Sequence, residues 1–357
     1  MEYIQPFFNN EVTCVFATDN NYALYLGVAI QSLICNASKE NNYGIYILEE
    51  NVDEKYKKIL LKMSTDNIKI KIVNTKDLLS NYPEDMFYTH SHFSKATYYR
   101  FFITDIFSNF NKVIYLDCDL IINTDIAELY YIDIEENYVG CVNYAPFKAG
   151  DRINYIKDLG LKNQNVYFNA GVMIFNIQNL KTVNFTNKCI NTLKTDKKYK
   201  WLDQDVLNLV CENKIKFIDI SWNIPNLCLF KGYMKENRND KNNVFFEQLE
   251  KSAACPKIMH YNSHLKPWNN TTLINAELWW KYARYTIFYE TLLYKMIEKH
   301  LSQIVSTKNN ISAKKILQSI FSITNSSDKK HKILTILGIK IKFNVAKTLT
   351  GVETERE

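Results

Sequence analysis

The chain has 357 residues, of which 46% are hydrophobic and 23% charged, with a formal net charge of +6. This length suits one large domain with additions, or two domains, and the hydrophobic content allows a substantial core. Residues 301–347 carry a net charge of +8 and residues 348–357 a net charge of −2, so residues 1–300 are neutral. A neutral body excludes a uniformly basic nucleic-acid-binding protein.

The first part of the chain alternates predicted strands and helices. The apolar run "EVTCVFAT" (11–18) predicts a buried strand, and "NNYALYLGVAIQSLICNA" (20–37) has helical spacing. A strand "YGIYILEE" (43–50), a helix "VDEKYKKILLKMST" (52–65) and a strand "IKIKIVN" (68–74) follow. This alternation predicts an α/β fold, a single Rossmann-like domain with a mainly parallel sheet covered on both faces.

The middle of the chain contains the most informative strand. Residues 94–110 predict a helix, and "KVIYLDCDLII" (112–122) predicts a strand whose apolar run ends in Asp117 and Asp119. Ligands bind at the carboxyl ends of strands in open α/β sheets, and the first strand ends at Asp19, so we expect these carboxylates at one edge. No glycine-rich phosphate loop follows the first strand, which argues against dinucleotide dehydrogenases and P-loop enzymes.

The remaining segments complete the body. "VYFNAGVMIFNI" (166–177) predicts a strand, "WLDQDVLNLVCEN" (201–213) a helix and "KIKFIDISWNI" (214–224) a strand. "PKIMHYNSHLKPWNN" (256–270) has too few apolar positions for a regular element, and 276–301 predicts one long helix that ends the body. We therefore place one compact domain at 1–300, a basic amphipathic segment at 301–347 and a disordered end at 348–357.

The paired aspartates suggest a metal site. Hard divalent cations take oxygen ligands, and Mg²⁺ or Mn²⁺ commonly bridges carboxylates to substrate phosphates. The loop "HYNSHLKPW" adds His260, His264, Lys266 and Trp268 within nine residues. Imidazole suits Mn²⁺ as a third ligand, and a lysine suits a phosphate. The alternative is a turn with two solvated aspartates, together with an ordinary surface or core histidine.

The cysteines and the N-terminus bear on localisation. Eight scattered cysteines form no CxxC pair and mostly lie in apolar runs, which indicates reduced thiols in a cytosolic protein. The N-terminal residues lack the basic and apolar regions of a signal peptide, and no run reaches the length of a membrane span. We expect a cytoplasmic protein.

Six ordered blocks resemble a known family. They are "FATDNNYALYLGVAIQSL", "ATYYRFFITDIF", "KVIYLDCDLIINTDIAELY", "YFNAGVMIFNI", "WLDQDVLN" and "HYNSHLKPW". Together they resemble the family 8 retaining glycosyltransferases, which include bacterial lipooligosaccharide α-galactosyltransferases and glucosyltransferases and glycogenin. The resemblance covers residues 11 to 285 and implies a GT-A type fold, a UDP-hexose donor, a saccharide or lipid-linked saccharide acceptor and a role in surface glycan synthesis such as lipopolysaccharide.

The resemblance also implies roles for individual residues. Asp117, Asp119 and His260 would bind Mn²⁺, with Mg²⁺ as an alternative. The catalytic positions would be Asp203, which contacts the sugar, and Gln204, which faces the anomeric carbon. The donor would be held by Ala17, Asp19, Asn21, Tyr22, His92, Arg100, Asp117, Cys118, Asn169, Gly171 and Lys266.

The residue at the anomeric position bears on the mechanism. Retaining glycoside hydrolases use two carboxylates and a covalent intermediate. The amide of Gln204 is a poor nucleophile, so we favour front-side attack by the acceptor hydroxyl, with a covalent route as the alternative. Structural roles are the competing interpretation for several residues: Asp203 as a helix cap, Arg100 as an ion-pair partner and Tyr22 as a core aromatic.

Two positions depart from the family pattern. The family's last motif usually has glycine where this chain has His264, and a bulky side chain there would alter the loop near the phosphates. After "YVGCVNYAP" (138–146), no aspartate stands where several members carry one near the donor sugar, and Asn143 or Tyr144 is found there. The identity of the hexose, galactose or glucose, therefore stays open.

The basic tail suggests a membrane partner. "AKKILQSIFSI" (313–323) and "KKHKILTILGIKIKF" (329–343) alternate lysine with isoleucine and leucine, as segments that bind anionic membrane surfaces do. Such contact would be peripheral, on the inner face of the membrane. A final helix and strand packed on the body is the alternative. For the whole chain, the competing functions are a carbohydrate-binding protein with a weak or inactive transferase fold and a self-glycosylating enzyme.

Overall fold

The structure, a computed structural model, describes residues 4–90, 94–144, 151–163, 165–194, 198–226, 244–307, 321–325, 331–336 and 339–344. Contacts between residues divide the chain into two compact units, Met1–Leu293 and Tyr294–Glu357.

A seven-stranded sheet forms the centre of the first unit, with strand order β3-β2-β1-β4-β7-β6-β8. The strands β3, β2, β1 and β4 pair in parallel, β7 runs antiparallel to both β4 and β6, and β8 is parallel to β6. The predicted mainly parallel sheet is therefore confirmed. The strand bounds are β1 (Glu11–Ala17), β2 (Asn42–Glu49), β3 (Ile68–Asn74), β4 (Lys112–Leu116), β6 (Val139–Asn143), β7 (Phe168–Asn176) and β8 (Ile215–Phe217).

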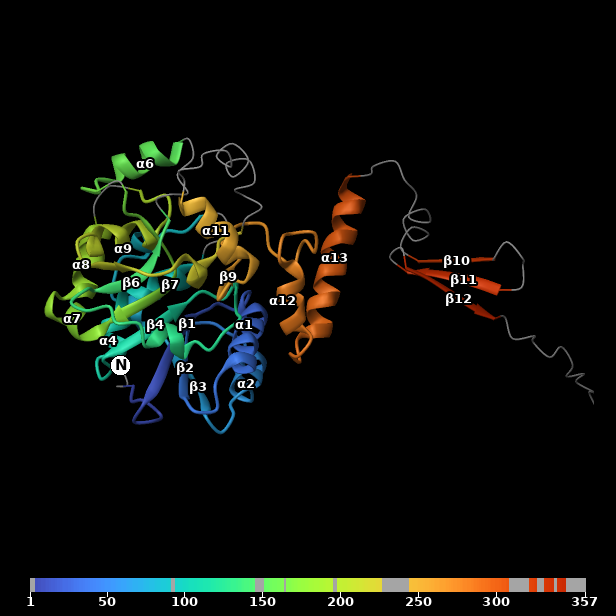
Figure 1. Cartoon of the computed structure of the whole chain (residues 1–357), viewed down its shortest axis with the longest axis horizontal. Helices are drawn as coiled ribbons and strands as arrows, with labels where there is room; N and C mark the ends of the chain where they lie inside the picture. The colour runs from blue at the N-terminus through green and yellow to red at the C-terminus, as the bar shows by residue number, and fades with distance from the viewer. Residues whose placement is uncertain are drawn as a thin grey trace, which may run out of the picture. The chain divides into compact units, whose positions relative to one another are not determined.

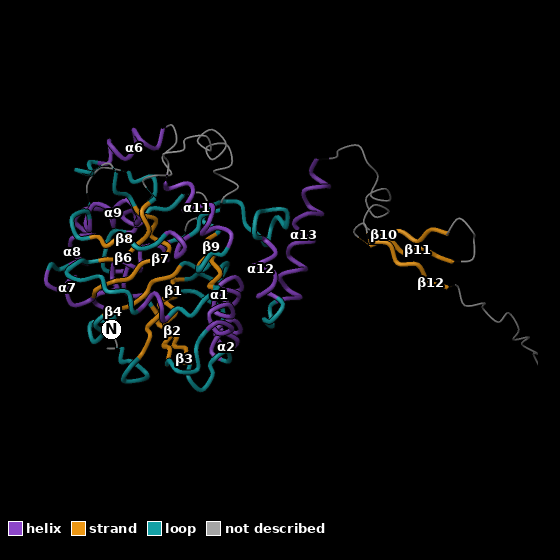
Figure 2. The backbone as a smooth tube through the Cα atoms, viewed as in Figure 1, coloured by secondary structure: helices purple, strands orange, loops and turns teal. Residues whose placement is uncertain are grey.

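Helices lie on both sides of this sheet, with α1 and α2 on one side and α7 and α8 on the other (Figure 1; Figure 2 shows the strands between them). The helices of this unit are α1 (Ala23–Asn36), α2 (Glu54–Leu61), α3 (Lys76–Ser80), α4 (Ile103–Ile106), α5 (Ala127–Tyr130), α6 (Asp151–Leu159), α7 (Ile177–Thr182), α8 (Phe185–Leu193), α9 (Asp203–Cys211), α11 (Val244–Ala254) and α12 (Ala276–Ala283).

Burial on both faces explains why the central strands read as continuous apolar runs. All seven residues of β1 are buried, and so are Val113 to Leu116 of β4. The strand order reverses between β1 and β4, because β2 and β3 extend the sheet on one side and β4 on the other. Ligands in open α/β sheets bind at such a switch point, outside the carboxyl ends of the strands.

The segment 112–122 differs from the prediction. It forms two strands, because β4 ends at Leu116 and β5 (Leu120–Ile122) belongs to a second, two-stranded sheet. The chain leaves the large sheet at the two polar aspartates. The partner of β5 is β9 (Ile258–His260), which lies in the segment where we expected no regular element. Three residues are too few to produce a readable apolar pattern.

Two further segments contain shorter elements than predicted. The segment 94–110 is a 3₁₀ helix, η2 (Lys95–Phe102), followed by α4. In 214–224 only β8 is a strand, and the 3₁₀ helix η4 (Ile220–Asn223) follows it. Another 3₁₀ turn, η1, covers Glu84–Phe87.

The predicted helix 276–301 is broken into α12 and α13 (Tyr289–Thr307). The buried Phe288 lies between them and packs against Gly27 of α1, where an added Cβ would be 2.4 Å from its ring. The aromatic contact with α1 is therefore possible only because position 27 has no side chain.

The second unit contains the end of α13 and a three-stranded antiparallel sheet. Its strands are β10 (Phe321–Asn325), β11 (His331–Ile336) and β12 (Ile339–Asn344). The tail thus begins with the last residues of α13, up to Thr307, and forms strands in its later described residues. Residues 308–320 and the predicted disordered end, 348–357, lie outside the described residues. Among the described helices, none has the length and apolar character needed to span a bilayer.

Candidate active site

A cavity of about 470 Å³ opens at the carboxyl ends of β1 and β4. It collects residues that are far apart in the sequence, from the ends of β1 and β4, the start of β7 and the start of α9. Most residues singled out in the sequence line it: Ala17, Asp19, Tyr22, Arg100, Asp117, Cys118, Asp119, Asn169, Gly171, Asp203, Gln204, His260, His264 and Lys266.

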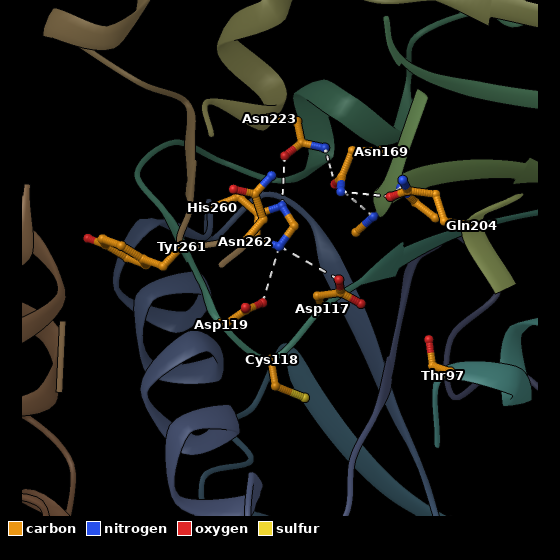
Figure 3. Close-up of polar contacts among 12 residues, drawn as sticks. Thr97, Asp117, Cys118, Asp119, Asn169, Gln204, Asn223, His260, Tyr261 and Asn262 are labelled. Carbon is orange, nitrogen blue, oxygen red and sulfur yellow. Dashed lines mark hydrogen bonds and ion pairs between the residues drawn. The ribbon is translucent and has the colours of Figure 1, made fainter. Parts of the chain in front are cut away.

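Asp117, Asp119 and His260 form a cluster that could hold a metal ion, with ligand atoms within 4.8 Å of one another (Figure 3). The two aspartates follow β4, and the short β5–β9 sheet brings the histidine beside them. In that sheet Leu120 pairs with His260, and the backbone N–H of Tyr261 donates to the carbonyl of Asp119 at 2.9 Å.

The cluster fits a hard divalent cation on its own geometry. His260 Nε2 lies 3.2 Å from Asp119 Oδ1 and 3.6 Å from Asp117 Oδ2, while its Nδ1 lies 2.9 Å from Asn223 Oδ1. Because that amide oxygen can only accept a hydrogen bond, Nδ1 carries the proton and Nε2 can offer a lone pair to an ion. Two carboxylates and one neutral imidazole suit Mn²⁺.

Lys266 neutralises part of this acidic site. Its buried ammonium group contacts Asp119 Oδ2 and donates to the carbonyl of Tyr261 at 2.9 Å. Burial raises the pKa of Asp119, but Lys266 and His260 outweigh that effect and hold the pKa below its usual value. Asp119 is therefore ionised at neutral pH and available as a ligand.

Arg100 joins the metal cluster to Asp203. Its buried guanidinium donates to Asp117 Oδ1 at 3.0 Å and to the carbonyl of Ala170 at 2.6 Å. It also lies 2.9 Å from Asp203 Oδ2, and it stacks on the ring of Tyr115 with 4.3 Å to the centroid. The residue expected to reach the donor is thus also an ion-pair partner of two carboxylates.

Asp203 is a buried carboxylate in the wall of the cavity. Thr97 Oγ1 donates to its Oδ1, whereas Oδ2 is close to Arg100 but receives no hydrogen bond from any described residue. Burial raises the pKa of Asp203 to about 6, against the opposing effects of Arg100 and Thr97. Oδ2 is itself buried and lies 2.9 Å from the guanidinium of Arg100, so Asp203 contributes to the cavity wall a carboxylate that is paired with arginine.

Gln204 is held rigidly on three sides. Its Oε1 accepts from Asn169 Nδ2 at 2.9 Å and from the backbone N–H of Ala170 at 3.1 Å, and its Nε2 donates to the hydroxyl of Tyr167 at 2.9 Å. Both lone pairs of the amide oxygen are therefore engaged. This arrangement leaves Gln204 even less suited to nucleophilic attack than a free amide.

Several residues in this network were not found from the sequence. Tyr167 and Asp205 lie inside two of the quoted blocks, so their position next to Asn169 and Gln204 was a usable signal. Thr97 likewise falls inside "ATYYRFFITDIF". Asn223, by contrast, follows Trp222 in a segment that resembles a strand, and nothing in the local pattern marks it.

Only some of the residues expected to hold the nucleotide line the cavity. Asp19 Oδ1 accepts from the backbone N–H of Tyr22 at 2.9 Å, so Asp19 orients the start of α1 as well as lining the cavity. The buried thiol of Cys118 donates to the carbonyl of Ala17 at 3.1 Å. Asn21 is exposed and is not among the cavity-lining residues, and His92 lies outside the described residues.

Two residues of the loop after β9, Trp268 and His264, differ in exposure, and Tyr144 lies at the other position that departs from the family pattern. Trp268 is buried and stacks on Tyr25 with ring centroids 4.0 Å apart, which makes it a core aromatic. His264 is exposed at the cavity. Where several family members carry an aspartate, Tyr144 lines the cavity and its hydroxyl donates to the carbonyl of Asn223 at 2.7 Å.

Comparison with known proteins agrees with this geometry. The sequence model of glycosyl transferase family 8 matches residues 13–272. A Haemophilus influenzae protein described as a glycosyltransferase is 33% identical over 212 residues, 58% of this chain and 62% of its own length. This chain thus spans under two thirds of that relative.

Two relatives are named for lipopolysaccharide synthesis. A lipopolysaccharide 1,2-glucosyltransferase of Escherichia coli is 24% identical over 85% of this chain and 87% of its own length. A lipopolysaccharide 1,3-galactosyltransferase of Salmonella typhimurium is 27% identical over 75% of this chain and 76% of its own length.

Solved structures share the fold. The bifunctional glycosyltransferase WbbM matches with a TM-score of 0.67 and 26% identity, over 82% of this chain and 53% of that protein. The galactosyltransferase LgtC, solved with donor and acceptor sugar analogues, matches with a TM-score of 0.62 and 22% identity, over 77% of this chain and 96% of that protein. The fold is therefore that of GT-A glycosyltransferases.

Proposed function

The chain belongs to glycosyl transferase family 8, and we propose that it is a retaining hexosyltransferase that moves galactose or glucose from a UDP-sugar to a saccharide acceptor. The observation that carries this proposal is the Asp117–Asp119–His260 cluster, which opens into the same cavity as Asp203 and Gln204. The relatives named for glucosyl and galactosyl transfer support the choice of hexose class.

Mn²⁺ is the ion that the cluster suits best, with Mg²⁺ as the alternative. When bound, it would supply Lewis-acid stabilisation of the diphosphate leaving group. Lys266 lies at the same place and brings a second positive charge to the departing phosphate. Arg100 holds Asp117 and keeps it turned toward the cluster.

The stereochemistry that we propose rests on Asp203 and Gln204, the two residues expected to face the sugar. Asp203 lines this side of the cavity, paired with Arg100, and its carboxylate would receive a hydroxyl of the hexose. Gln204 presents a fixed neutral amide rather than a nucleophile. We therefore favour front-side attack, in which the acceptor oxygen bonds to the anomeric carbon, the sugar–phosphate bond breaks and the proton passes to the released diphosphate.

The acceptor that we propose is a saccharide of a surface glycan, such as lipooligosaccharide or lipopolysaccharide, free or linked to lipid. The basic segment 301–347, with net charge +8, would hold the enzyme peripherally at an anionic membrane on the cytoplasmic side, where a lipid-linked acceptor resides.

The test is a donor screen. Purified protein is incubated with each UDP-hexose and Mn²⁺, with and without candidate saccharides, and released UDP is measured. NMR of the product's anomeric proton then decides the stereochemistry. We expect turnover of UDP-galactose or UDP-glucose and an α-linked product from the α-linked donor. A β-linked product, or no turnover with any UDP-sugar, would contradict the proposal.

Two alternative functions are separated by further measurements. A carbohydrate-binding protein with an inactive fold would bind saccharides equally well after loss of Asp117 and Asp119. A self-glycosylating enzyme would gain the mass of a hexose when incubated with donor alone, which intact-mass spectrometry detects.

A further inference from the structure

We propose that Asn223 is a positioning residue that orients, through one directional chain of amides, both the metal-ligand nitrogen of His260 and the side chain of Gln204. The inference rests on the proposed function in one respect, because His260 must bind a metal. It concerns how two parts of the cavity, the metal cluster and the position facing the sugar, are held in matching orientations.

The chain of hydrogen bonds is continuous, with Asn223 and His260 buried and Asn169 and Gln204 half-buried at the cavity (Figure 3). His260 Nδ1 lies 2.9 Å from Asn223 Oδ1, and Asn223 Nδ2 donates to Asn169 Oδ1 at 3.1 Å. Asn169 Nδ2 donates to Gln204 Oε1 at 2.9 Å. Asn223 lies in η4 and is fully buried, so no water competes for its amide.

The far end of the chain is an acceptor. Gln204 Nε2 donates to the hydroxyl of Tyr167, which in turn donates to Asp205 Oδ1 at 2.6 Å. The carboxylate of Asp205 also receives the hydroxyl of Tyr155 and, at 2.8 Å, the backbone N–H of Trp201. With these donors around it, Asp205 acts only as an acceptor, which fixes the direction of the Tyr167 hydroxyl.

Two backbone groups determine which way the central amides point. The N–H of Ala170 faces Gln204 at 3.1 Å, and the N–H of Gly171 faces Asn169 at 3.1 Å. A backbone N–H can only donate, so each of these amides must turn its oxygen toward it. Each NH₂ group then points to the next acceptor along the chain.

The direction of these hydrogen bonds also determines how Asn223 and His260 are oriented. Because Asn169 presents its oxygen, Asn223 must present its NH₂ group to Asn169 and its oxygen to His260. His260 then carries its proton on Nδ1, and Nε2 is left to face Asp117 and Asp119. Partners of this kind orient a ligating histidine, and their loss typically costs 10- to 100-fold in metal affinity.

The experiment compares two substitutions of Asn223 that separate the two ends of the chain. Asn223→Leu keeps the approximate volume and removes the hydrogen bonds to His260 and Asn169, together with a third, from the hydroxyl of Tyr144 to Oδ1. Asn223→Asp keeps an acceptor for His260 but places a carboxylate oxygen against Asn169 Oδ1. The N–H of Gly171 holds that oxygen in place, so the two oxygens repel each other and Asn169 is displaced from Gln204. Asn208→Leu is the matched control for metal binding, since Asn208 is also buried but, among the described residues, bonds only to the backbone of Phe168 and Gln204, and not to the amide of Asn169 or to His260.

Three quantities are measured: the dissociation constant for Mn²⁺ alone by electron paramagnetic resonance of the free ion, kcat with the UDP-sugar, and the unfolding temperature. We expect Asn223→Leu to bind Mn²⁺ about 10- to 100-fold more weakly. Asn223→Asp should bind it within roughly threefold of the wild type, yet lose on the order of tenfold in kcat, about 1.4 kcal/mol. Asn208→Leu should unfold at a lower temperature with unchanged Mn²⁺ binding.

The outcomes distinguish this proposal from the proposed function. If Asn223→Leu binds Mn²⁺ as the wild type does, or if Asn223→Asp keeps full kcat, Asn223 does not orient both groups and the inference is overturned. If Asn208→Leu weakens Mn²⁺ binding as much as Asn223→Leu, general loosening explains the effect. If the wild type itself binds no Mn²⁺, the metal in the proposed function is wrong and the positioning role falls with it.

Discussion

Gly171 and His260 approach so closely that a Cβ added at Gly171 would lie 2.2 Å from His260 Cε1. The same Cβ would lie 2.6 Å from Asp117 Oδ2. Gly171 is the fourth residue of β7, which pairs with β4, and its carbonyl accepts from the backbone N–H of Asp117 at 2.8 Å. The backbone of β7 therefore forms the wall of the metal cluster.

Gly171→Ala should consequently disturb metal binding more than stability. The methyl group must push the imidazole and the carboxylate apart, because both lie well inside van der Waals contact. We expect Mn²⁺ binding to weaken at least tenfold, which corresponds to about 1.4 kcal/mol, measured by electron paramagnetic resonance of the free ion. Gly140→Ala is the control, since its crowding comes from Ile134 and Ile174 in the core. Equal Mn²⁺ affinity in the two variants would contradict the role given to Gly171.

Removal of the metal or of one ligand should abolish turnover. A metal that bridges phosphate oxygens stabilises the leaving group by several kcal/mol, so Asp119→Ala should lose on the order of a thousandfold in kcat, at about 1.4 kcal/mol for each tenfold. Initial rates of UDP release measure this loss. EDTA should inactivate the wild type, and added Mn²⁺ should restore the wild type but not the variant. Full turnover in EDTA would exclude a metal-dependent reaction.

The stability of the metal-free protein should depend on pH through Asp203. Burial raises its pKa from the usual 3.8 to about 6 in the folded state, so the folded state binds this proton more tightly than the unfolded chain does. The protonated Asp203 therefore contributes to the free energy of unfolding. This contribution is complete below the pKa that Asp203 has in the unfolded chain, and it is lost as the pH rises through about 6. One pKa unit corresponds to about 1.4 kcal/mol.

Asp203→Asn cannot titrate and should not show this loss. Between pH 4.5 and 7.5, the difference in unfolding free energy should shift in favour of the variant by on the order of 2 kcal/mol. Urea unfolding at several pH values measures it. The variant also loses the ion pair between Arg100 and Asp203, which lowers its unfolding free energy. This loss is the same at every pH in the range, so it does not alter the change of the difference with pH. A difference that stays the same across this range would show that the carboxylate of Asp203 is not titrating there.

Truncation after Thr307, the last residue of α13, should separate catalysis from membrane binding. The segment 301–347 has net charge +8 and the body none, so attraction to anionic vesicles should reside in the tail. Each lysine near such a surface contributes about 1 kcal/mol, and the effect should weaken with salt, since the Debye length is about 8 Å at physiological ionic strength. Donor hydrolysis should stay nearly intact.

Co-sedimentation with phosphatidylserine-containing vesicles, with phosphatidylcholine vesicles as the control, measures the effect at low and high salt. If the full and truncated proteins sediment equally, the tail does not bind membranes. If the truncated protein becomes insoluble, the tail has a structural role in the body, and the membrane proposal should be abandoned.

The sequence by itself determined the class of fold and the position of the carboxylate pair. Apolar periodicity is a local property, and it predicted β1, α1, β2, α2 and β3 because each element buries one face or both against a large core. The ordered blocks then indicated the family, and with it the residues that line the cavity. Local patterns failed where elements are short, as at β9 and β5, or where a predicted helix is divided, as α12 and α13 are on either side of Phe288.

Only the tertiary structure decided which polar groups meet. Asp119 and His260 are 141 residues apart and are joined through the pairing of Leu120 with His260. Lys266 contacts Asp119, and Arg100 bridges Asp117 and Asp203. The sequence around Lys266 or Arg100 does not indicate these partners. Asn223 became significant only through the donors and acceptors around it. A polar side chain has the same local pattern whether it faces water or a buried partner, and strand register and backbone N–H direction determine which of the two it meets.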